Sequence, residues 1–448
     1  MTGAPHVVVC GTGLAGSVAA DRLAARGARV TVLEKRDAPG GSSWMSGGWF
    51  ALAGTARQRE HGIEDSAAVF RDDLVRSGGG FADPALLDRL VDRQHEAIAA
   101  LDRAAAWRRE LKTSAGMSRP RAHLADIRRL LSDLHDRLRA RGVEVRLGCG
   151  ASALLDDGGA VRGVRTEAGD IAADAVVLAT GGFSRARDLI ALFAPDQLPA
   201  MPYGGPGNTG DGLRMAWRLG AGLADVGHVA GTYGQHPDTG DDEHELLTAN
   251  YLGAILVDAR GDRFVDESAS YKRLGPAVLA RAGGHAFQVF DATVRARSRP
   301  GVPLSDIDRI EELGHLVRAD SIADLERRLE IPRGRLQRTM AQYAEVAAGR
   351  RADPFGRRSL VGGTGALAPL STAPFYAYGA VTAMTSTYGG VRIDPTTQVR
   401  RVDGSAIAGL YAAGEVAGGV HGSSYMTGAA LTWALVSGVL AAEAAIAG

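Results

Sequence analysis

The chain has 448 residues, and its 60 glycines are roughly twice the usual share of about 7%. These glycines show no three-residue period and lie among apolar runs, in a sequence that is 45% hydrophobic, which excludes collagen-like and low-complexity chains. Lys and Arg together number 51, as do Asp and Glu, so charge gives no reason to expect nucleic acid or an anionic membrane surface as a partner. The length predicts two or three domains, or one domain with a large insertion.

The cysteine content and the two ends of the chain predict a cytoplasmic protein without a membrane span. Cys10 and Cys149 are too few for a disulfide framework, a zinc site or an iron–sulfur site. A strand predicted from about His6 leaves no room for a signal peptide. The C-terminal stretch 429–448 has one charged residue, but it contains as much Ala, Gly, Ser and Thr as Leu and Val, so we expect a buried helix there.

The first 34 residues predict a strand, a glycine-rich turn, a helix and a second strand. Residues 6–10 form a short apolar run, and the turn Gly11-Thr-Gly13-Leu-Ala-Gly16 leads into a helical pattern over 17–26. The second apolar run, 29–34, follows at once. The pattern is that of a βαβ unit.

Further helices and strands follow, and the character of the sequence changes in its middle. A polar loop at 238–245 and a charged helical stretch at 305–349 predict an inserted domain. We therefore expect an α/β fold with a discontinuous Rossmann-like domain, residues 1–230 and 387–448, and an inserted α+β domain, residues 231–386. Expected helices cover 83–111 and 121–141, and expected strands cover 142–147, 160–165, 175–179, 253–258, 388–393 and 409–414.

The glycine turn predicts a dinucleotide site. Gly11 allows a tight turn, Gly13 lets a phosphate approach the backbone, and Gly16 lets the helix and strand pack closely, with the helix N-terminus facing a pyrophosphate. Glu34 ends the second strand, where an acid meets ribose hydroxyls and disfavours a 2′-phosphate. The alternative is a glycine-rich turn that binds nothing.

Two more segments fit the same cofactor. Residues 175–182 end a strand with small residues, and 409–415 end a strand with glycine and an acid that can accept from a sugar-alcohol hydroxyl. With Glu34-Lys-Arg-x-x-x-Gly40-Gly41-Ser42-Ser43 between them and the first turn, they resemble the FAD-binding signature of the fumarate reductase and succinate dehydrogenase flavoprotein superfamily. The resemblance extends along the whole chain, through 53–55, 62–66, 210–212, 261–264 and 418–422.

This resemblance implies that the discontinuous domain binds FAD and that the inserted domain caps the substrate. The FAD is expected to be non-covalent, because residues 40–55 contain no histidine. No second glycine motif lies between a strand and a helix, so we expect an external electron partner, unidentified, rather than a nicotinamide site. The implied FAD contacts are Gly11, Gly13, Leu14, Ala15, Gly16, Glu34, Lys35, Gly41, Ser42, Ser43, Gly47, Gly48, Ala151, Ala179, Thr180, Gly181, Asn208, Asp211, Gly414, Glu415, Ala430 and Leu431; no metal ligand is expected.

The substrate positions depart from the carboxylate reductases. Tyr271 stands where they have a catalytic arginine, and Tyr425 stands where an arginine grips the substrate carboxylate. Ser386 replaces a histidine, while His236 is the candidate for another family histidine. Because Arg holds a carboxylate in bidentate fashion and Tyr cannot, these changes argue against a fumarate-like dicarboxylate.

The two tyrosines instead resemble the 3-ketosteroid dehydrogenases, especially those acting at the 4-position, with Tyr425-Met-Thr427-Gly428 in place of a Tyr-x-Ser-Gly motif. That resemblance implies α,β-dehydrogenation of a small, apolar, cyclic ketone with hydride transfer to flavin N5. Tyr425, with Thr427 or a backbone N–H near Ala429, would donate to the ketone oxygen. Tyr271 would take the α-proton, which requires a nearby phenol or cation to lower its pKa, and Lys272 or Arg273 are the candidates.

Several alternatives stay open on the sequence alone. The same site run backwards is an ene-reductase, and Arg357 or Arg273 would serve a reductase of unsaturated carboxylates. A flavin-bearing electron carrier without substrate chemistry is a third function. Arg121 and His123 either line a cleft or start a helix, and His421 is expected beside the flavin as a donor.

Overall fold

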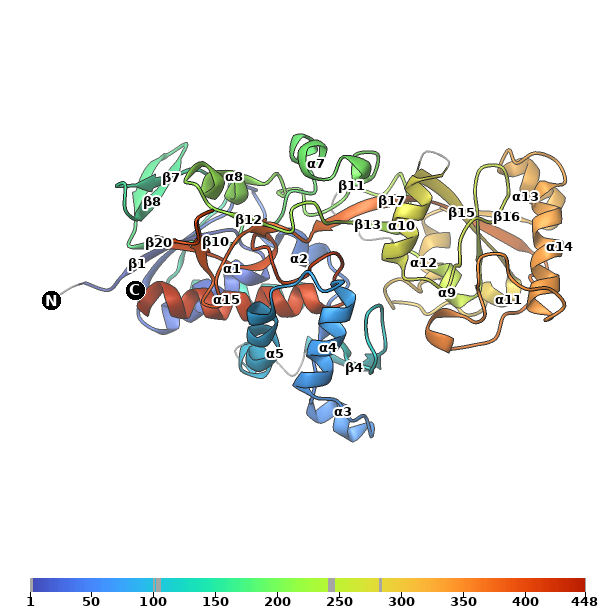
Figure 1. The fold of residues 1–448 in the computed structure, drawn as a ribbon, viewed down its shortest axis with the longest axis horizontal. Coiled ribbons are helices and arrows are strands. Elements are labelled where there is room, and N and C mark those ends of the chain that lie inside the picture. Colours follow the sequence, from blue (N-terminus) through green and yellow to red (C-terminus); the bar gives the residue numbers. More distant parts are fainter. Residues whose placement is uncertain (1–2, 100, 102–105, 241–245, 282–283, 448) are drawn as a thin grey trace. The chain divides into compact units, whose positions relative to one another are not determined.

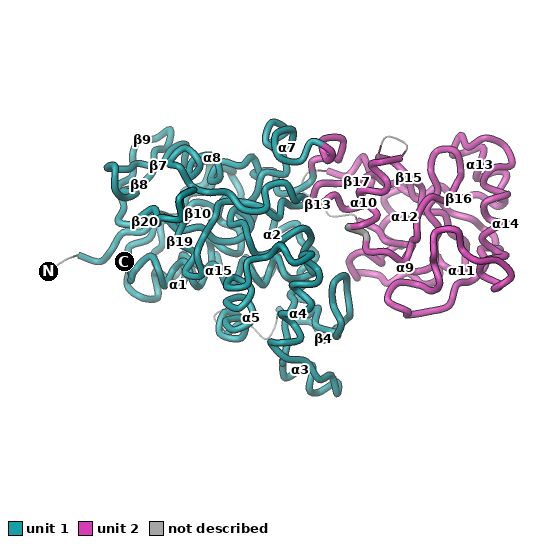
Figure 2. The backbone as a smooth tube through the Cα atoms, in the orientation of Figure 1, with its two compact units in different colours: residues 1–195, 203–229, 386–448 teal, residues 196–202, 230–385 magenta. Residues whose placement is uncertain are grey.

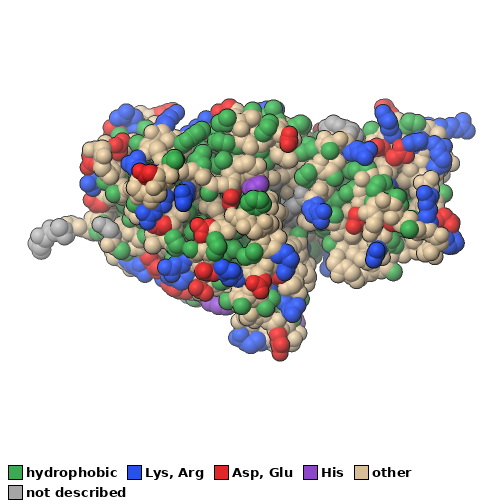
Figure 3. Space-filling view, viewed as in Figure 1, with side chains coloured by type: hydrophobic (Ala, Val, Ile, Leu, Met, Phe, Trp, Pro, Cys, Tyr) green, Lys and Arg blue, Asp and Glu red, His purple; other side chains and the backbone are tan. Residues whose placement is uncertain are grey.

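The computed structural model describes residues 3–99, 101, 106–240, 246–281 and 284–447. The chain forms two compact units. Unit 1 consists of Met1–Pro195, Tyr203–Val229 and Ser386–Gly448, and unit 2 consists of Asp196–Pro202 and Ala230–Thr385 (Figure 2). Acidic and basic side chains are interspersed on the face of each unit drawn in Figure 3.

Unit 1 is built on a six-stranded sheet with strand order β19-β20-β10-β1-β2-β6. Figure 1 labels three of its strands, β1, β10 and β20. Its strands are parallel except at the β19 edge. Val7, Val8 and Val9 of β1 are completely buried, as expected for a parallel strand covered on both faces. The strands are β1 (His6–Cys10), β2 (Arg29–Leu33), β6 (Glu144–Arg146), β10 (Ala175–Leu178), β19 (Gln398–Arg400) and β20 (Ala406–Ala412).

Helices α1 (Leu14–Ala25) and α15 (Ala429–Ala447) pack against each other in unit 1. Their close approach requires glycine, because a Cβ at Gly438 would lie 2.5 Å from the carbonyl oxygen of Ala15. Among the described residues, α15 is the one helix long and apolar enough to cross a membrane, and 72% of its apolar window is buried inside the protein. The helix is thus buried, as predicted.

The remaining elements of unit 1 surround this core. The helices are α2 (Gly41–Met45), α3 (Ala56–Glu60), α4 (Ala67–Ser77), α5 (Pro84–Ala99), α6 (Ile127–Ala140), α7 (Arg187–Phe193) and α8 (Asp211–Arg218), with 3-10 turns η2 (Pro195–Gln197, continuing into unit 2) and η5 (Gly414–Val416). Three small sheets contain β3 (Trp49–Ala51), β5 (Ala122–Ala125) and β4 (Trp107–Lys112); β7 (Ala151–Asp156), β8 (Val161–Thr166) and β9 (Gly169–Ala172); and β12 (Leu223–Ala224) with β18 (Gly390–Val391).

Two expected helix boundaries are wrong. Residues 107–111 and 122–125, predicted as parts of helices, belong to the antiparallel strands β4 and β5, and β5 also pairs with β3. Helix α6 begins only after Asp126, whose side chain accepts from the N–H of Arg129 at 3.1 Å. The pairing partner β3 lies about seventy residues earlier in the chain, so local periodicity did not reveal it.

Unit 2 is an α+β unit around a second six-stranded sheet. The long strand β17 (Phe375–Thr387) lies at its centre and pairs with β11, β13, β15 and β16. The other strands are β11 (Met201–Pro202), β13 (Val229–Gln235), β14 (Ile255–Val257), β15 (His285–Asp291) and β16 (Leu316–Ala319). The helices are α9 (Ala249–Leu252), α10 (Tyr271–Leu279), α11 (Ala292–Arg295), α12 (Ile307–Glu312), α13 (Ile322–Arg328) and α14 (Arg335–Ala347), with a 3-10 turn η4 (Val361–Gly363). The stretch 305–349, predicted as helical, therefore contains three helices and strand β16.

Candidate active site

The glycine turn lies at the carboxyl ends of the parallel strands of unit 1. Gly11 has φ of +113°, and a Cβ there would lie 2.2 Å from the carbonyl oxygen of Ala179. A Cβ at Gly16 would lie 2.0 Å from the carbonyl oxygen of Gly11. Only glycine permits these two approaches, which close the turn above the N-terminus of α1.

Glu34 closes the same turn from the end of β2. Its buried carboxylate accepts from the Thr12 N–H at 3.1 Å and the Thr12 hydroxyl at 2.6 Å, and from the Arg36 N–H at 3.0 Å. The carboxylate thus fixes the loops after β1 and β2 to each other. Its contact with a ribose remains a prediction.

Ser42 and Ser43 extend the site from the start of α2. The hydroxyl of Ser43 accepts from the Leu14 N–H at 3.1 Å, one of the first-turn groups of α1. The hydroxyl of Ser42 accepts from the Gly205 N–H and from Asn208 Nδ2, both at 3.0 Å. Two of the predicted cofactor residues, Ser42 and Asn208, are therefore in direct contact.

Glu415 joins this group from the turn after β20. Its carboxylate accepts from the Thr387 N–H at 2.9 Å and from Asn208 Nδ2 at 3.0 Å. Burial raises the pKa of the Glu415 carboxyl, while these two hydrogen bonds act in the opposite direction. A Cβ at Gly182 would lie 2.4 Å from this carboxylate, so a glycine is required there. Thr387 is a contact that the sequence analysis missed.

Lys35 and Asp211, predicted as two cofactor contacts, form an ion pair of 2.7 Å, and Lys35 Nζ also donates to the Thr209 hydroxyl at 2.5 Å. The other predicted cofactor residues lie at the ends of elements. Ala151 begins β7, Ala179 to Gly181 follow β10, Gly414 begins η5, Gly41 begins α2, Gly47 and Gly48 precede β3, and Ala430 and Leu431 are in the first turn of α15.

These groups fit an extended dinucleotide such as FAD. A Cβ at Gly13 would lie 3.6 Å from Ser43 Oγ and 3.7 Å from Gly40 O, which are ordinary van der Waals distances. Gly13, the N-cap of α1, supplies no side-chain cap, and a helix N-terminus of this kind is suited to an anionic phosphate. The buried Thr180 hydroxyl after β10 has no hydrogen-bond partner within the described residues.

Tyr425 lies in the turn that leads into α15. Its half-buried ring packs against two buried rings, Tyr388 at 5.3 Å and His421 at 5.6 Å between centroids. Thr427 is buried two residues later, and Ala429 is the first residue of α15. The predicted donors of the substrate site are therefore gathered at the N-terminus of a long buried helix, whose partial positive charge favours a developing oxyanion.

Two loops of unit 1 hold the Tyr425 turn. The Ser423 N–H donates to the Gly78 carbonyl at 3.0 Å, and the Thr427 N–H donates to the Ala115 carbonyl at 3.0 Å. Gly116 has φ of +87°, and a Cβ there would lie 2.3 Å from Ser77 Oγ. The position of Tyr425 thus depends on the loops after α4 and β4.

The proton-transfer candidates of unit 2 are described only in part. Tyr271 is the first residue of α10, but its side chain and that of Lys272 lie outside the described part of the structure. Arg273 is exposed. His236 follows β13, where its ring stacks on that of His315 with centroids 3.8 Å apart.

Arg357 has a structural role, contrary to the alternative in which it binds a carboxylate. Its guanidinium is completely buried, pairs with the carboxylate of Glu267 at 3.2 Å and donates to the carbonyls of Ala254 and Asn250 at 3.2 and 3.1 Å. Glu267 also accepts two hydrogen bonds from Arg263, at 2.6 and 2.7 Å. These buried charges compensate one another inside unit 2, which leaves Arg357 no exposed face for a substrate.

Arg121 and His123 neither start a helix nor present charge to a cleft. Arg121 is completely buried and binds both carboxylate oxygens of Asp65, at 2.6 and 2.9 Å. His123 lies on β5, where Nδ1 donates to the Arg121 carbonyl at 2.8 Å and Nε2 lies 2.9 Å from the Thr55 hydroxyl. Burial lowers the pKa of His123 to about 4, so the imidazole is neutral near pH 7 and its Nε2 accepts from that hydroxyl.

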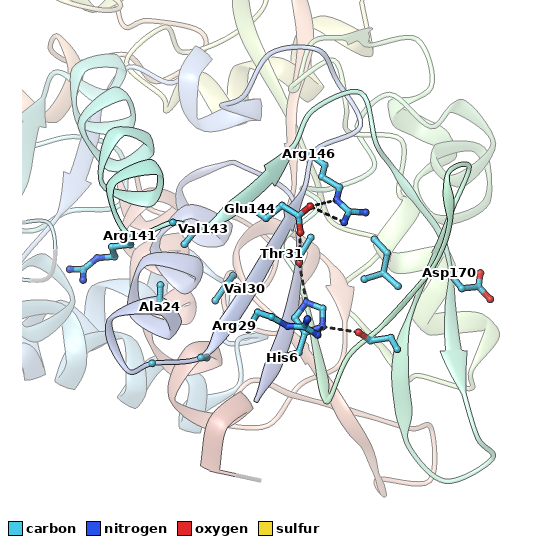
Figure 4. A pocket seen from close by; sticks show the side chains of 15 residues that line it. His6, Ala24, Arg29, Val30, Thr31, Arg141, Val143, Glu144, Arg146 and Asp170 are labelled. Carbon is cyan, nitrogen blue, oxygen red and sulfur yellow. Dashed lines mark hydrogen bonds and ion pairs between the residues drawn. The ribbon is translucent and has the colours of Figure 1, made fainter. Parts of the chain in front are cut away.

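A separate pocket lies at the opposite edge of the unit 1 sheet (Figure 4). It contains His6, whose Nε2 is 3.0 Å from the Thr31 hydroxyl, and Glu144, which accepts from that hydroxyl at 3.2 Å. Because it lies at the amino ends of β1 and β2, it is remote from the edge at which parallel sheets bind cofactors.

Comparison with known proteins agrees with this geometry. A family model described as an FAD binding domain matches residues 6–431. The chain is 31% identical over 462 residues to the fumarate reductase (cytochrome) of Shewanella frigidimarina, a match covering 99% of this chain and 78% of that protein. It is also 31% identical to the NADH:fumarate oxidoreductase of Klebsiella pneumoniae. That match covers 98% of this chain but only 47% of the Klebsiella protein, so the chain spans about half of that protein's length.

Solved structures show the same fold. The open conformation of a flavocytochrome c3 fumarate reductase superposes with a TM-score of 0.86 at 27% identity, covering 100% of this chain and 78% of that one. The 3-ketosteroid-Δ4-(5α)-dehydrogenase of Rhodococcus jostii superposes with a TM-score of 0.77 at 24% identity, covering 99% and 97%. At 24% identity, the likeness to the ketosteroid dehydrogenase shows a shared fold.

The buried imidazole predicts an acid-sensitive fold. Because the pKa of His123 is lowered to about 4 in the folded chain, its contribution to stability is complete above about pH 6.5 and is lost as the pH falls from there to about 4. The expected loss is about 3 kcal/mol. The free energy of unfolding should therefore depend less on pH in His123→Gln than in the wild type. His61→Gln, at an exposed position, should show the pH dependence of the wild type. Equal pH dependence of all three proteins would contradict this role.

Removal of the Glu415 carboxylate, which follows β20, is predicted to lower the affinity for FAD. Glu415→Ala should weaken FAD binding by about 10- to 100-fold, because hydrogen bonds to a charged group contribute about 1.5–3 kcal/mol. Glu144→Ala removes a carboxylate from the opposite edge of the same sheet and should change the affinity by less than about 2-fold. Titration of apoprotein with FAD measures both. An unchanged dissociation constant for Glu415→Ala would show that the carboxylate does not hold the cofactor.

Proposed function

The chain belongs to the fumarate reductase and succinate dehydrogenase flavoprotein family, whose FAD-binding domain it carries, and from this premise we propose that it desaturates the carbon–carbon bond next to a ketone in a cyclic, apolar substrate. The family acts on CH–CH groups with FAD. The observation that carries the ketone assignment is Tyr425 at the N-terminus of α15, in a turn held by two loops.

Tyr425 and Thr427 would bind the ketone oxygen. A phenol and a hydroxyl donate to a neutral carbonyl, and the N-terminus of α15 adds the positive end of a helix dipole. The hydrogen bonds from these donors become stronger as negative charge develops on the ketone oxygen during enolisation. Each donor of this kind contributes about 10²–10³ to the rate.

Tyr271 would accept the α-proton as the enolate forms. When bound, FAD supplies the oxidant that takes a hydride from the β-carbon, so that one proton and one hydride leave and a carbon–carbon double bond forms. Reoxidation of the cofactor then requires an external electron acceptor.

The charges of the chain support a neutral substrate. Arg357, a candidate ligand for a substrate carboxylate, is completely buried, and its two terminal nitrogens bond to Glu267 and to the backbone carbonyls of Ala254 and Asn250. Tyr425 stands where the carboxylate reductases have an arginine, and a phenol cannot form the bidentate pair that a carboxylate requires.

A second candidate function is reduction of an activated double bond by the same residues. The 31% identity to a fumarate reductase over 99% of the chain favours it. The two directions differ in which redox state of FAD meets the substrate, so they are separated by mixing oxidised enzyme with saturated ketones and reduced enzyme with unsaturated ones.

Tyr425→Phe tests the proposal, because it removes one hydroxyl and keeps the ring. Under anaerobic conditions, a cyclic ketone that bleaches the flavin of the wild type should do so about 10²–10³ times more slowly with Tyr425→Phe. Tyr411→Phe, which removes the hydroxyl of a buried tyrosine on β20, serves as the control and should retain the wild-type rate. The same bleaching rate in wild type and Tyr425→Phe would exclude Tyr425 as the carbonyl donor.

A further inference from the structure

Tyr388 is a buried aromatic residue that the sequence analysis did not select. It follows directly after β17, and its N–H donates to the His228 carbonyl at 3.0 Å. Its ring is only 3% exposed and meets Tyr425 edge to face, with centroids 5.3 Å apart and an interplanar angle of 71°. His421 completes the cluster, at 6.2 Å from Tyr388 and 5.6 Å from Tyr425.

Thr387, the residue before Tyr388, contacts Glu415, which is predicted to bind the cofactor. The Thr387 N–H donates to Glu415 at 2.9 Å, and the Thr387 hydroxyl lies 3.4 Å from the same carboxylate. One dipeptide therefore touches both the carboxylate predicted to bind the cofactor and the phenol predicted to bind the substrate. Its backbone is fixed on both sides, since the next residue, Gly389, has no space for a Cβ, which would lie 2.2 Å from Asp225 carbon.

The Tyr425 ring needs such a neighbour. The ring is half-buried, and it projects from a turn rather than from a helix or strand. Backbone hydrogen bonds at Ser423 and Thr427 fix the turn, but they do not fix the side-chain torsions of Tyr425. The edge-to-face contact with Tyr388 is directional, so it restricts the directions in which the phenol can point, and the tilted ring of His421 packs beside it.

We propose that Tyr388 is a positioning residue for Tyr425, which holds the phenol in the orientation that meets the ketone oxygen. The inference rests on the proposed function, in which Tyr425 donates to that oxygen. The contact that carries this role is the edge-to-face contact of the Tyr388 ring with the Tyr425 ring. Donor geometry is critical for such a step, because small misplacements of a reacting group lower rates steeply.

A double-mutant cycle separates positioning from general destabilisation. Tyr388→Leu should slow ketone-driven flavin reduction by about 3- to 10-fold, the rate equivalent of one aromatic pair, while Tyr388→Phe should stay within about 2-fold of the wild type. In a Tyr425→Phe background the hydroxyl to be positioned is gone, so Tyr388→Leu should have no further effect. An equal effect of Tyr388→Leu in both backgrounds would overturn the proposal.

A second measurement does not depend on turnover. Protein labelled with 3-fluorotyrosine gives one fluorine resonance per tyrosine, and the resonance missing from Tyr425→Phe identifies Tyr425. Tyr388→Leu should shift and broaden that resonance in the FAD-loaded protein, whereas Tyr411→Leu, which removes a buried ring on β20, should leave it unchanged. A Tyr425 resonance that is unchanged in Tyr388→Leu would also overturn the proposal.

The two measurements distinguish the two claims. If no cyclic ketone bleaches the wild-type flavin, the proposed function fails, and the fluorine spectrum alone then decides whether Tyr388 orders Tyr425. If ketones bleach the flavin but Tyr388→Leu changes neither the rate nor the spectrum, the function stands and the positioning role is wrong.

Discussion

The site depends on backbone segments that approach each other more closely than any side chain would allow. A Cβ at Gly11 would collide with Ala179, one at Gly16 with Gly11, and one at Gly438 with Ala15. These contacts join β1 to the loop after β10, close the turn above α1 and bring α15 onto α1. The glycines at these positions are thus required at this edge of the sheet, where backbone N–H groups and a helix N-terminus are predicted to face the phosphates of FAD.

The same edge brings together residues that are predicted to contact the cofactor and residues that are predicted to contact the substrate. Gly182 leaves room for the carboxylate of Glu415, and the end of β17 contacts that carboxylate through Thr387 and the Tyr425 ring through Tyr388. The positions of the predicted donors are therefore coupled to the packing around Glu415, a predicted cofactor contact. In unit 2, by contrast, buried charged side chains pair with one another. Arg357 is one of them: its side chain is completely buried and pairs with Glu267.

Local sequence patterns predicted the elements that depend on neighbours in the chain. The βαβ unit and the helix at 429–447 were readable because a glycine turn, short apolar runs and a long uncharged stretch each carry their own signal. Non-local contacts were not readable in this way. The segments of β4 and β5 resembled helices until the pairing of β5 with β3 and β4 was known, and the contact of Ser42 with Asn208 joins residues 166 apart in sequence. Tyr388 gave no signal, because its significance comes only from the ring that it contacts.

The central proposal is that the substrate is a neutral ketone and not a carboxylate. The most direct measurement is the absorbance of the oxidised flavin after anaerobic mixing of the full-length holoprotein with saturated cyclic ketones, such as 5α-reduced 3-ketosteroids, and with succinate in parallel. Ketones are expected to bleach the flavin, and succinate is expected to leave its absorbance unchanged. Bleaching by succinate alone, or no bleaching by ketones together with rapid reoxidation of the reduced flavin by fumarate, would contradict the proposal.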